Sequence, residues 1–366
     1  MAKETKLQKN AASNDFPEFD AICDKAIDYI HQARQNVVRS VNHEQVIAYW
    51  KIGQLIVEQE QKGQARAEYG SFLITTLSTK LSHEFKRGFS ISNLRYMRQF
   101  YLMYKERIHQ TVSGESNQLE FNKNLSWSHH LVLMKESHEK SRSFYEIEAI
   151  KNHWSVRQLS RQIHSSLYER LAASRDEKGI MALANKGQEI TTPEEALKDP
   201  VVLDFLGYKQ HHRYTEHDLE TGIIDHLQDF LLEMGRGFAF MGRQKRLTID
   251  GKHYYPDLVF FHTILRCYII VDLKITELEH GDVGQMLLYV NYYDREVKLT
   301  DDNPTIGLLL CKHKNDAVVK YMTPKYDQQI FARKYQFHLP SVDELKKEVT
   351  REYNEVIEQL SCKDDE

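Results

Sequence analysis

Several features that would fix a functional class are missing from this 366-residue sequence. It has no apolar run near the ~20 residues that cross a bilayer, so we expect no contact with a membrane. The first ten residues, MAKETKLQKN, have no apolar stretch behind their lysines, so we expect no signal peptide and a cytoplasmic protein. No glycine-rich phosphate loop is present, which argues against ATP hydrolysis.

Cysteine is scarce and scattered, which argues against a zinc site. The four cysteines form no CxxC pair and are Cys23, Cys267, Cys311 and Cys362. We expect the thiols of Cys267 and Cys311 to be buried and inert, because both lie in apolar runs typical of strands. The pairs His129–His130 and His211–His212 lack a third ligand, and adjacent side chains diverge, so we expect ordinary histidines there.

The net charge of -4 argues against a uniformly basic surface, although a local basic patch would suffice to bind phosphates. The length predicts about two domains of ~150 residues. The patterns predict a helical N-terminal domain over 16–171, a linker over 172–198, an α/β domain over 199–345, and a charged helix and tail over 346–366. Residues 1–15 are polar and are expected to be disordered.

The helical half contains two helices separated by KRGFS, residues 86–90, which resembles a helix-turn-helix. We expect Ser92 to cap the second of these helices. Ser155 and Gln158 have the spacing of a capping box and predict a helix from Val156 to about Leu171.

The C-terminal half changes period and predicts a layered α/β domain. The expected elements, in chain order, are a helix over 215–234, strands over 238–249, 253–262 and 267–274, a helix over 281–297, a strand over 305–312, another near 318–322, and a helix over 341–360.

Three residues in this half are candidates for a catalytic metal site. Asp257 follows Pro256, and Asp272 and Lys274 lie in the strand YIIVDLKI. Residues two apart on a strand share a face, so Asp272 and Lys274 point the same way, and a hairpin would place Asp257 beside Asp272. Two adjacent carboxylates remain ionised only with a cation between them, and oxygen ligands suit Mg²⁺ or Mn²⁺. A lysine there could orient a water or meet a developing oxyanion.

Further residues could complete such a site. Glu220 is the preferred third acidic ligand and Glu233 is its rival. Gln285 and Tyr289 are four apart and share a helical face, from which they could bind a metal-bound water, a phosphate or a base.

Each of these features also has an ordinary explanation. DLK can be a surface charge pair, Pro-Asp a turn, and Tyr289 a core residue. The conjunction of PD, DxK and QxxxY in this order of elements favours a nuclease site.

The sequence is similar to the YhcG-type PD-(D/E)xK nuclease family from about residue 20 to 345. In the C-terminal half the resemblance rests on FLLEMGRGFAFMGRQKRL, PDLVFFHTILRCYIIVDLKITELEHGDVGQMLLYVNYYDRE and NPTIGLLLCKHKND. In the N-terminal half it rests on YWKIGQLI, RGFSISNLRYMRQFY, LSWSHH and WSVRQLSRQI. The resemblance implies an α/β restriction-endonuclease-like core with an all-α N-terminal domain. It places Asp257, Asp272 and Lys274 at the family's acidic and lysine positions.

The N-terminal arginines are candidates for contacts with nucleic acid. Arg87 lies in the predicted turn, Arg95 and Arg98 share one face of the helix that follows, and Arg157 and Arg161 form a second pair. An ordinary exposed basic face is the competing explanation. We expect a Mg²⁺-dependent endonuclease that acts on DNA, in defence or DNA processing, and a homo-oligomer is plausible. The alternatives are RNA as the substrate, or a catalytically silent module that binds DNA or protein.

Overall fold

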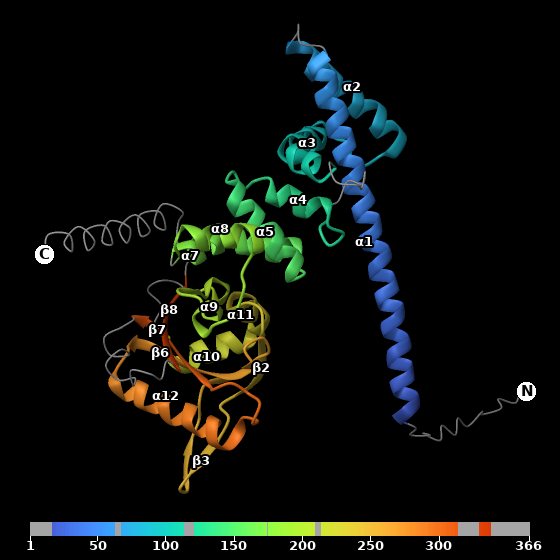
Figure 1. Ribbon diagram of the computed structural model, residues 1–366. Helices are drawn as coiled ribbons and strands as arrows, with labels where there is room; N and C mark the ends of the chain where they lie inside the picture. Colours follow the sequence, from blue (N-terminus) through green and yellow to red (C-terminus); the bar gives the residue numbers. More distant parts are fainter. Residues whose placement is uncertain are drawn as a thin grey trace, which may run out of the picture. The chain divides into compact units, whose positions relative to one another are not determined.

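The computed structural model describes residues 17–62, 67–112, 121–173, 175–208, 214–313 and 329–337. The expectations for residues 1–15, His211–His212, 318–322 and 341–366 lie outside these ranges. The chain divides into two compact units, Met1–Met134 and Lys135–Glu366. Figure 1 shows the elements of each unit, coloured along the sequence.

The first unit is helical, as predicted. Its helices are α1 (Pro17–Lys62), α2 (Ala67–Phe85), α3 (Ile91–Val112) and α4 (Trp127–Leu133). The carboxyl half of α1 packs on α3 around an aromatic core that includes Trp50 and Phe100. Gly53 allows the two helices to approach closely, because a Cβ there would lie 2.1 Å from the Met97 carbonyl oxygen.

The KRGFS turn between α2 and α3 is present, but its cap differs from the prediction. Lys86 and Gly88 take positive φ values of 64° and 97°, which reverse the chain. Ser90 Oγ then accepts a hydrogen bond of 3.2 Å from the amide of Asn93. Ser90 therefore caps α3, and the prediction of Ser92 was wrong because the helix begins directly after the turn, before its first buried residue.

The second unit begins with helices that flank the sheet domain. They are α5 (Glu139–Lys151), α6 (Val156–His164), α7 (Leu167–Ala173), α8 (Glu177–Lys186) and α9 (Pro193–Ala196). The predicted capping box is confirmed: Ser155 Oγ accepts from the amide of Gln158 at 3.3 Å, and Gln158 Oε1 accepts from the amide of Ser155 at 2.8 Å.

The segment expected to be a linker, 172–198, contains α8 and α9 instead of a loose connection. Asp176 caps α8 by accepting from the amide of Gly179 at 2.8 Å. Leu183 and Ala184 are buried, and the hydroxyl of Ser143 donates to the Ala184 carbonyl at 2.8 Å. The small residues of this segment allow α8 to lie close to α5.

A six-stranded mixed sheet forms the centre of the second unit. Its spatial order is β1-β8-β7-β6-β5-β2. The strands are β1 (Val201–Val202), β2 (Phe238–Arg243), β5 (Leu258–His262), β6 (Cys267–Glu277), β7 (Ile306–His313) and β8 (Ile330–Gln336). Strands β6, β7, β8 and β1 are parallel, whereas β5 pairs antiparallel with both β6 and β2.

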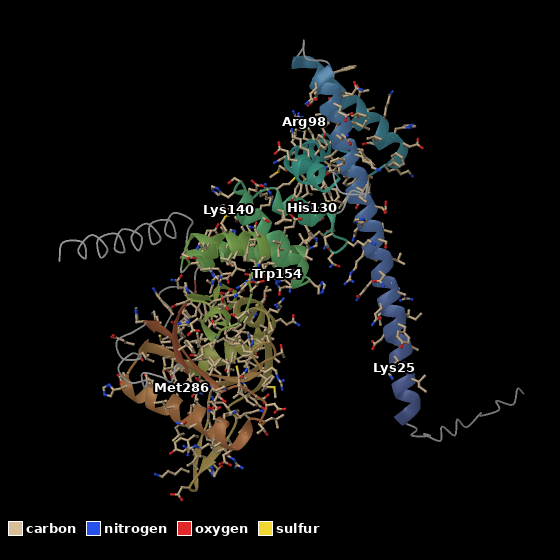
Figure 2. All side chains as sticks on the ribbon, viewed as in Figure 1. Lys25, Arg98, His130, Lys140, Trp154 and Met286 are labelled. Carbon is tan, nitrogen blue, oxygen red and sulfur yellow. The ribbon has the colours of Figure 1, made fainter. Side chains whose placement is uncertain are left out.

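Helices cover both faces of the sheet (Figure 1), which gives a layered α/β domain as predicted. On one face, α10 (Glu216–Asp225) and α11 (Leu227–Met234) share a core with side chains of β5, β6 and β7. On the other face, α12 (His280–Tyr292) packs through Met286, which is labelled in Figure 2. Cys267 and Cys311 are thiols buried in this sheet, as predicted. No helix in the described ranges is long and apolar enough to cross a membrane.

The predicted strands 238–249 and 253–262 are each divided. Strand β2 ends at Arg243, and β3 (Leu247–Ile249) pairs with β4 (Lys252–Tyr254) in a separate hairpin. The division follows from backbone at positive φ, at Gln244 (46°) and at the hairpin turn Asp250–Gly251 (47° and 74°). An Asp-Gly dipeptide between short β-rich runs is a hairpin signal that the prediction missed.

The predicted helices are also shorter than expected. Residues 215–234 form two helices, because His226 leaves the helical region with φ -114° and ψ 34°. Helix α12 ends at Tyr292 and continues as a π-helical turn, Tyr293–Val297. The break at His226 matters for the site, because it separates Glu220 on α10 from Glu233 on α11.

Candidate active site

Asp257 and Asp272 lie side by side at one end of the β5–β6 pair. Leu258 is paired with Val271 in the antiparallel register, so the next residues outwards are Asp257 and Asp272. Asp257 Oδ2 also accepts a hydrogen bond of 2.8 Å from the amide of Leu273. The predicted adjacency of the two aspartates is confirmed.

Lys274 completes the cluster from the same face of β6. Its Nζ lies 2.8 Å from Asp272 Oδ2, 3.7 Å from Asp282 Oδ1 and 3.8 Å from Glu216 Oε2. Burial alone would lower the pKa of Lys274, but these carboxylates, Asp272 first among them, raise it well above its ordinary value. Lys274 therefore keeps its positive charge at any physiological pH.

The surroundings of both aspartates oppose their ionisation. Burial and the charge of Asp272 raise the pKa of Asp257 from its ordinary 3.8 to about 7. Burial also raises the pKa of Asp272, although Lys274 acts in the opposite direction. A pair of buried carboxylates therefore holds less than its full negative charge at neutral pH unless a cation joins it.

Gln244 links a third carboxylate to this pair. Its Nε2 donates to Glu220 Oε2 at 3.0 Å and to Asp257 Oδ1 at 3.0 Å. The backbone amide of Gln244 donates to the Asp257 carbonyl at 3.0 Å, which fixes the residue in its left-handed conformation. Gln244 was not predicted as a site residue. The break between β2 and the β3–β4 hairpin, which places Gln244 beside Asp257, is the feature that could have indicated it.

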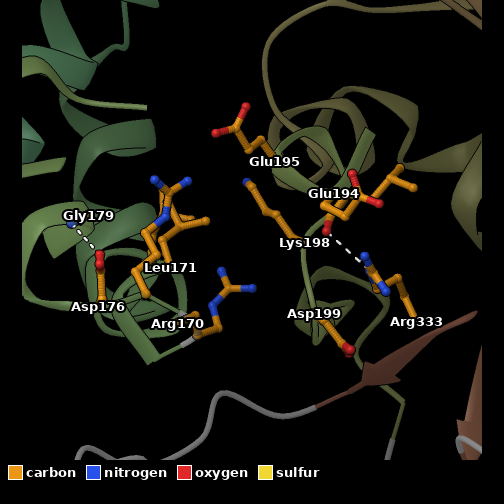
Figure 3. Close-up of a pocket in the computed structure, with 12 residues that line it drawn as sticks. Arg170, Leu171, Asp176, Gly179, Glu194, Glu195, Lys198, Asp199 and Arg333 are labelled. Carbon is orange, nitrogen blue, oxygen red and sulfur yellow. Dashed lines mark hydrogen bonds between the residues drawn. The ribbon is translucent and has the colours of Figure 1, made fainter. Parts of the chain in front are cut away.

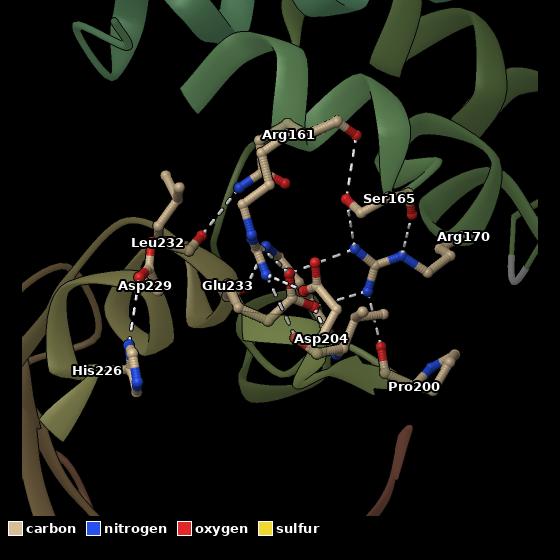
Figure 4. Close-up of polar contacts among 12 residues, drawn as sticks. Arg161, Ser165, Arg170, Pro200, Asp204, His226, Asp229, Leu232 and Glu233 are labelled. Atoms are coloured by element: carbon tan, nitrogen blue, oxygen red, sulfur yellow. Dashed lines mark hydrogen bonds and ion pairs between the residues drawn. The ribbon is translucent and has the colours of Figure 1, made fainter. Parts of the chain in front are cut away.

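Glu233, the rival of Glu220, belongs to a different polar cluster (Figure 4). It is fully buried, with Oε1 at 2.8 Å from Arg170 Nη1 and accepting from the amide of Val202 at 2.9 Å, while Oε2 lies 3.5 Å from Arg161 Nη1. Burial would raise the pKa of Glu233, but Arg170 and Lys198 lower it to about 2. Its contacts thus join α6, α7 and β1 to α11.

The QxxxY pair lies on one face of α12, as predicted. The side-chain amide of Gln285 donates to the Tyr289 hydroxyl, which in turn donates to the Tyr255 carbonyl at 3.4 Å. Tyr289 is buried, which raises its pKa, and Asp272 and Asp257 act on it in the same direction. Through Tyr255 the pair is connected to the Pro256–Asp257 segment, while Gln285 remains exposed.

Known protein families match both the N-terminal and the C-terminal parts of the chain. Residues 194–350 match the YhcG PDDEXK nuclease domain, and residues 25–170 match the DUF1016 N-terminal domain. The Escherichia coli (strain K12) protein named "Putative nuclease YhcG" is 41% identical over 354 residues, which cover 91% of this chain and 94% of that protein. The chain belongs to the YhcG family of PDDEXK nucleases.

A solved structure adds no argument to this family membership. The crystal structure of a repair endonuclease from Pyrococcus abyssi matches 36% of this chain and 50% of that chain at 16% identity, with a TM-score of 0.24. Membership in the YhcG family therefore rests on the sequence matches, and the site on the geometry described above.

The donor set of this YhcG-family site fits a hard divalent cation. Asp257 and Asp272 offer adjacent carboxylate oxygens whose mutual repulsion a cation would relieve. Among the residues that the structure describes, no three acidic, histidine or cysteine side chains are grouped closely enough for a complete metal site. Glu220 is joined to Asp257 only through the amide of Gln244, so that amide would have to move before Glu220 could become a ligand.

A cavity of about 570 Å³ lies elsewhere in the second unit, between α7–α8 and the segment that leads into β1 (Figure 3). Its lining includes Lys198, Asp199 and Arg333 and none of the residues of the Asp257 cluster. Burial lowers the pKa of Lys198 to about 8, although Glu233 opposes this shift. The amine of Lys198 donates to the Glu233 carbonyl, so this lysine belongs to the polar cluster around Glu233.

The candidate arginines differ in availability. Arg87 and Arg95, at the turn and start of α3, are exposed, whereas Arg98 forms an ion pair of 2.7 Å with Glu60. On α6, Arg157 is exposed, whereas Arg161 forms an ion pair of 2.8 Å with Asp204. The structure thus leaves three of the five predicted arginines free of ion pairs within the described ranges.

The described histidine pair is built into the first unit. His129 Nδ1 accepts a hydrogen bond of 3.1 Å from the amide of Ser126. His130 is fully buried, and its ring centroid lies 4.8 Å from that of Phe100. These contacts place both histidines in the packing around α4.

Proposed function

We propose that this chain is a metal-dependent nuclease that hydrolyses phosphodiester bonds of DNA at the cluster of Asp257, Asp272 and Lys274. The observation that carries the proposal is the pair of buried carboxylates with raised pKa values, set beside a lysine held in its charged state. Perturbed groups of opposite charge, converging within a nuclease-family domain, are typical of a catalytic centre.

Asp257 and Asp272 would hold Mg²⁺ or Mn²⁺, with Glu220 as the additional carboxylate. When bound, the cation would lower the pKa of a coordinated water and stabilise negative charge on the phosphate. Lys274 supplies a fixed positive charge that orients the attacking water or meets the developing oxyanion. Gln285 is exposed on α12 and hydrogen-bonded to Tyr289, and it would contact a phosphate or base of the substrate.

The substrate is tested with the full chain and four labelled probes: duplex DNA, branched DNA, single-stranded DNA and RNA. Each probe is incubated with Mg²⁺, with Mn²⁺ and with EDTA. We expect cleavage of at least one DNA probe in metal and none in EDTA. Cleavage of RNA alone would replace DNA as the substrate, and binding without cleavage of any probe would favour a silent binding module.

The first unit is proposed to bind the nucleic acid through exposed arginines near the α2–α3 turn. Arg87→Ala combined with Arg95→Ala is expected to weaken DNA binding and to reduce the slope of log affinity against log salt by about 2, since each phosphate contact contributes about 1. Fluorescence anisotropy over a salt series measures both quantities. Lys51→Ala, which removes an exposed charge on α1, serves as the control. An unchanged salt slope in the double variant would show that Arg87 and Arg95 do not contact the nucleic acid.

The raised pKa of Asp257 predicts how metal-free protein responds to pH. Because its folded pKa of about 7 lies above the ordinary 3.8, folding disfavours the charged form. Stability is therefore greatest where Asp257 is protonated and falls as the pH rises from about 4 through 7.

We expect thermal unfolding in EDTA to show this decline in the wild type, a smaller decline in Asp257→Asn, and recovery of the wild type on addition of Mn²⁺ at pH 8. Equal pH profiles for the two proteins would contradict the coupling of the aspartates. If Mn²⁺ stabilised Asp257→Asn against thermal unfolding as much as it stabilised the wild type, the metal would bind elsewhere.

A further inference from the structure

The amino-terminal half of α1 carries apolar side chains that the first unit does not cover. Seven of them are more than half exposed: Ile22, Ile27, Tyr29, Ile30, Val37, Val38 and Val41. From Val46 onward the same helix is buried against α3, with Trp50 only 4% exposed. Figure 2 shows the uncovered half around Lys25, where α1 extends beyond the packed helices of its unit. Adjacent exposed apolar residues of this number are typical of an interaction surface.

Four of these residues, Ile22, Ile30, Val37 and Val41, share one face of the helix with Ala26 and Ala33, and the spacing of the six is symmetric. Positions 22, 26, 30, 33, 37 and 41 are all apolar and are separated by intervals of 4, 4, 3, 4 and 4 residues. These intervals place all six positions within one stripe of a helix about 30 Å long. The series of intervals is the same when read from either end. Two copies of this helix that run in opposite directions can therefore align their apolar positions.

A second copy that runs antiparallel would place position 22 opposite 41, 26 opposite 37 and 30 opposite 33. Each apolar position then meets an apolar position, and a twofold axis passes between residues 31 and 32. Such an arrangement is isologous, because the same surface serves both partners. The steps of 4, 4 and 3 residues add up to an 11-residue repeat, which keeps one apolar seam facing a partner helix along its length.

The charges of α1 are complementary in the same register. Residues 17–30 contain four acidic residues and one lysine, whereas residues 31–43 contain arginines and histidines and no acidic residue. In the antiparallel register residue 24, an aspartate, lies at the level of Arg39, and Asp28 lies beside the level of Arg34. A parallel pair would place like charges at the same level, which destabilises a helix pair.

We infer that the amino-terminal half of α1 is a dimerisation helix that pairs antiparallel with a second copy of this chain. A membrane surface fits less well, because membrane-bound amphipathic helices have basic polar faces and this segment begins with an acidic one. The same acidic segment would repel a nucleic acid. Self-pairing uses both halves of the charge pattern and the whole apolar stripe.

The oligomeric state of the full chain tests this inference. Light scattering and sedimentation at tens of micromolar protein are expected to give a dimer. Ile30→Glu combined with Val37→Glu is expected to weaken the dimer by roughly tenfold or more. Because both side chains are exposed in the single chain, circular dichroism of the double variant should match that of the wild type. The controls Leu55→Glu and Leu299→Glu, also at exposed apolar positions, should remain dimeric.

The direction of the pairing is tested by crosslinking in a background with Cys23→Ser and Cys362→Ser. Chains carrying Ile30→Cys are mixed with differently tagged chains carrying Ala33→Cys and are oxidised gently. An antiparallel pair is expected to give mixed crosslinks, whereas a parallel pair would give crosslinks within each type. A monomeric wild type, a dimer that survives the double glutamate variant, or crosslinks only between like chains would overturn the proposed pairing.

Discussion

Asp257→Asn is expected to reduce cleavage by about 10³-fold or more while the protein remains folded. The asparagine keeps the shape of the side chain but removes the charge that would hold the cation. Loss of several kcal/mol of metal-based stabilisation in the transition state corresponds to a factor of this size. Because burial and the neighbouring Asp272 disfavour the charged form of Asp257, the variant should also be the more heat-resistant protein in EDTA above pH 7.

Lys274→Ala is measured in the same cleavage assay. We expect it to lower the cleavage rate by about 10²- to 10³-fold, which is the usual cost of removing a charge-stabilising donor. Asp250→Asn, at the exposed tip of the β3–β4 hairpin, is the matched control and should cleave like the wild type. Cleavage at the wild-type rate in both Asp257→Asn and Lys274→Ala would move the catalytic centre to another part of the chain.

Glu233→Ala is expected to destabilise the second unit by about 3–5 kcal/mol. Removal of this buried carboxylate leaves the guanidinium of Arg170, also buried, without its ion pair. Glu220→Ala removes only a hydrogen bond from Gln244 and should change stability by about 1 kcal/mol while reducing cleavage. Urea unfolding and the cleavage assay, run on both variants, separate the two glutamates.

The pH dependence of unfolding gives a second test of Glu233. Its folded pKa of about 2 lies below the ordinary 4.5, so its stabilising contribution is complete above pH ~5 and is lost as the pH falls towards 2. Glu233→Ala should lack this part of the acid dependence. If instead Glu220→Ala unfolds easily and Glu233→Ala only loses activity, the two roles proposed for these residues are reversed.

The core of the candidate site could be predicted because it depends on local geometry. The two-residue period of a strand fixes the shared face of Asp272 and Lys274, and a hairpin brings Asp257 to the same level. The four-residue spacing of Gln285 and Tyr289 likewise fixes a shared face of α12. These relations need only the correct element type, and the structure has strands and a helix where they were predicted.

The rest of the site could not be predicted because it depends on where elements break. The helix break at His226 separates Glu220, which lies near Asp257, from Glu233, and a periodic apolar stripe does not reveal that break. Gln244 reaches both Glu220 and Asp257 only because it follows β2 in a left-handed conformation. The prediction of a linker over 172–198 was also wrong, because a helix rich in small residues has a weak apolar pattern even when it is well packed.

The central claim is that Asp257 and Asp272 hold the cation on which cleavage depends. Its most direct test is a Mn²⁺ titration at pH 8 of the wild type and Asp257→Asn, with bound metal and cleavage of the best DNA probe measured in the same samples. We predict that binding and cleavage rise together in the wild type and that both are lost in the variant. Equal Mn²⁺ binding and equal cleavage in the two proteins would contradict the metal site at Asp257 and Asp272.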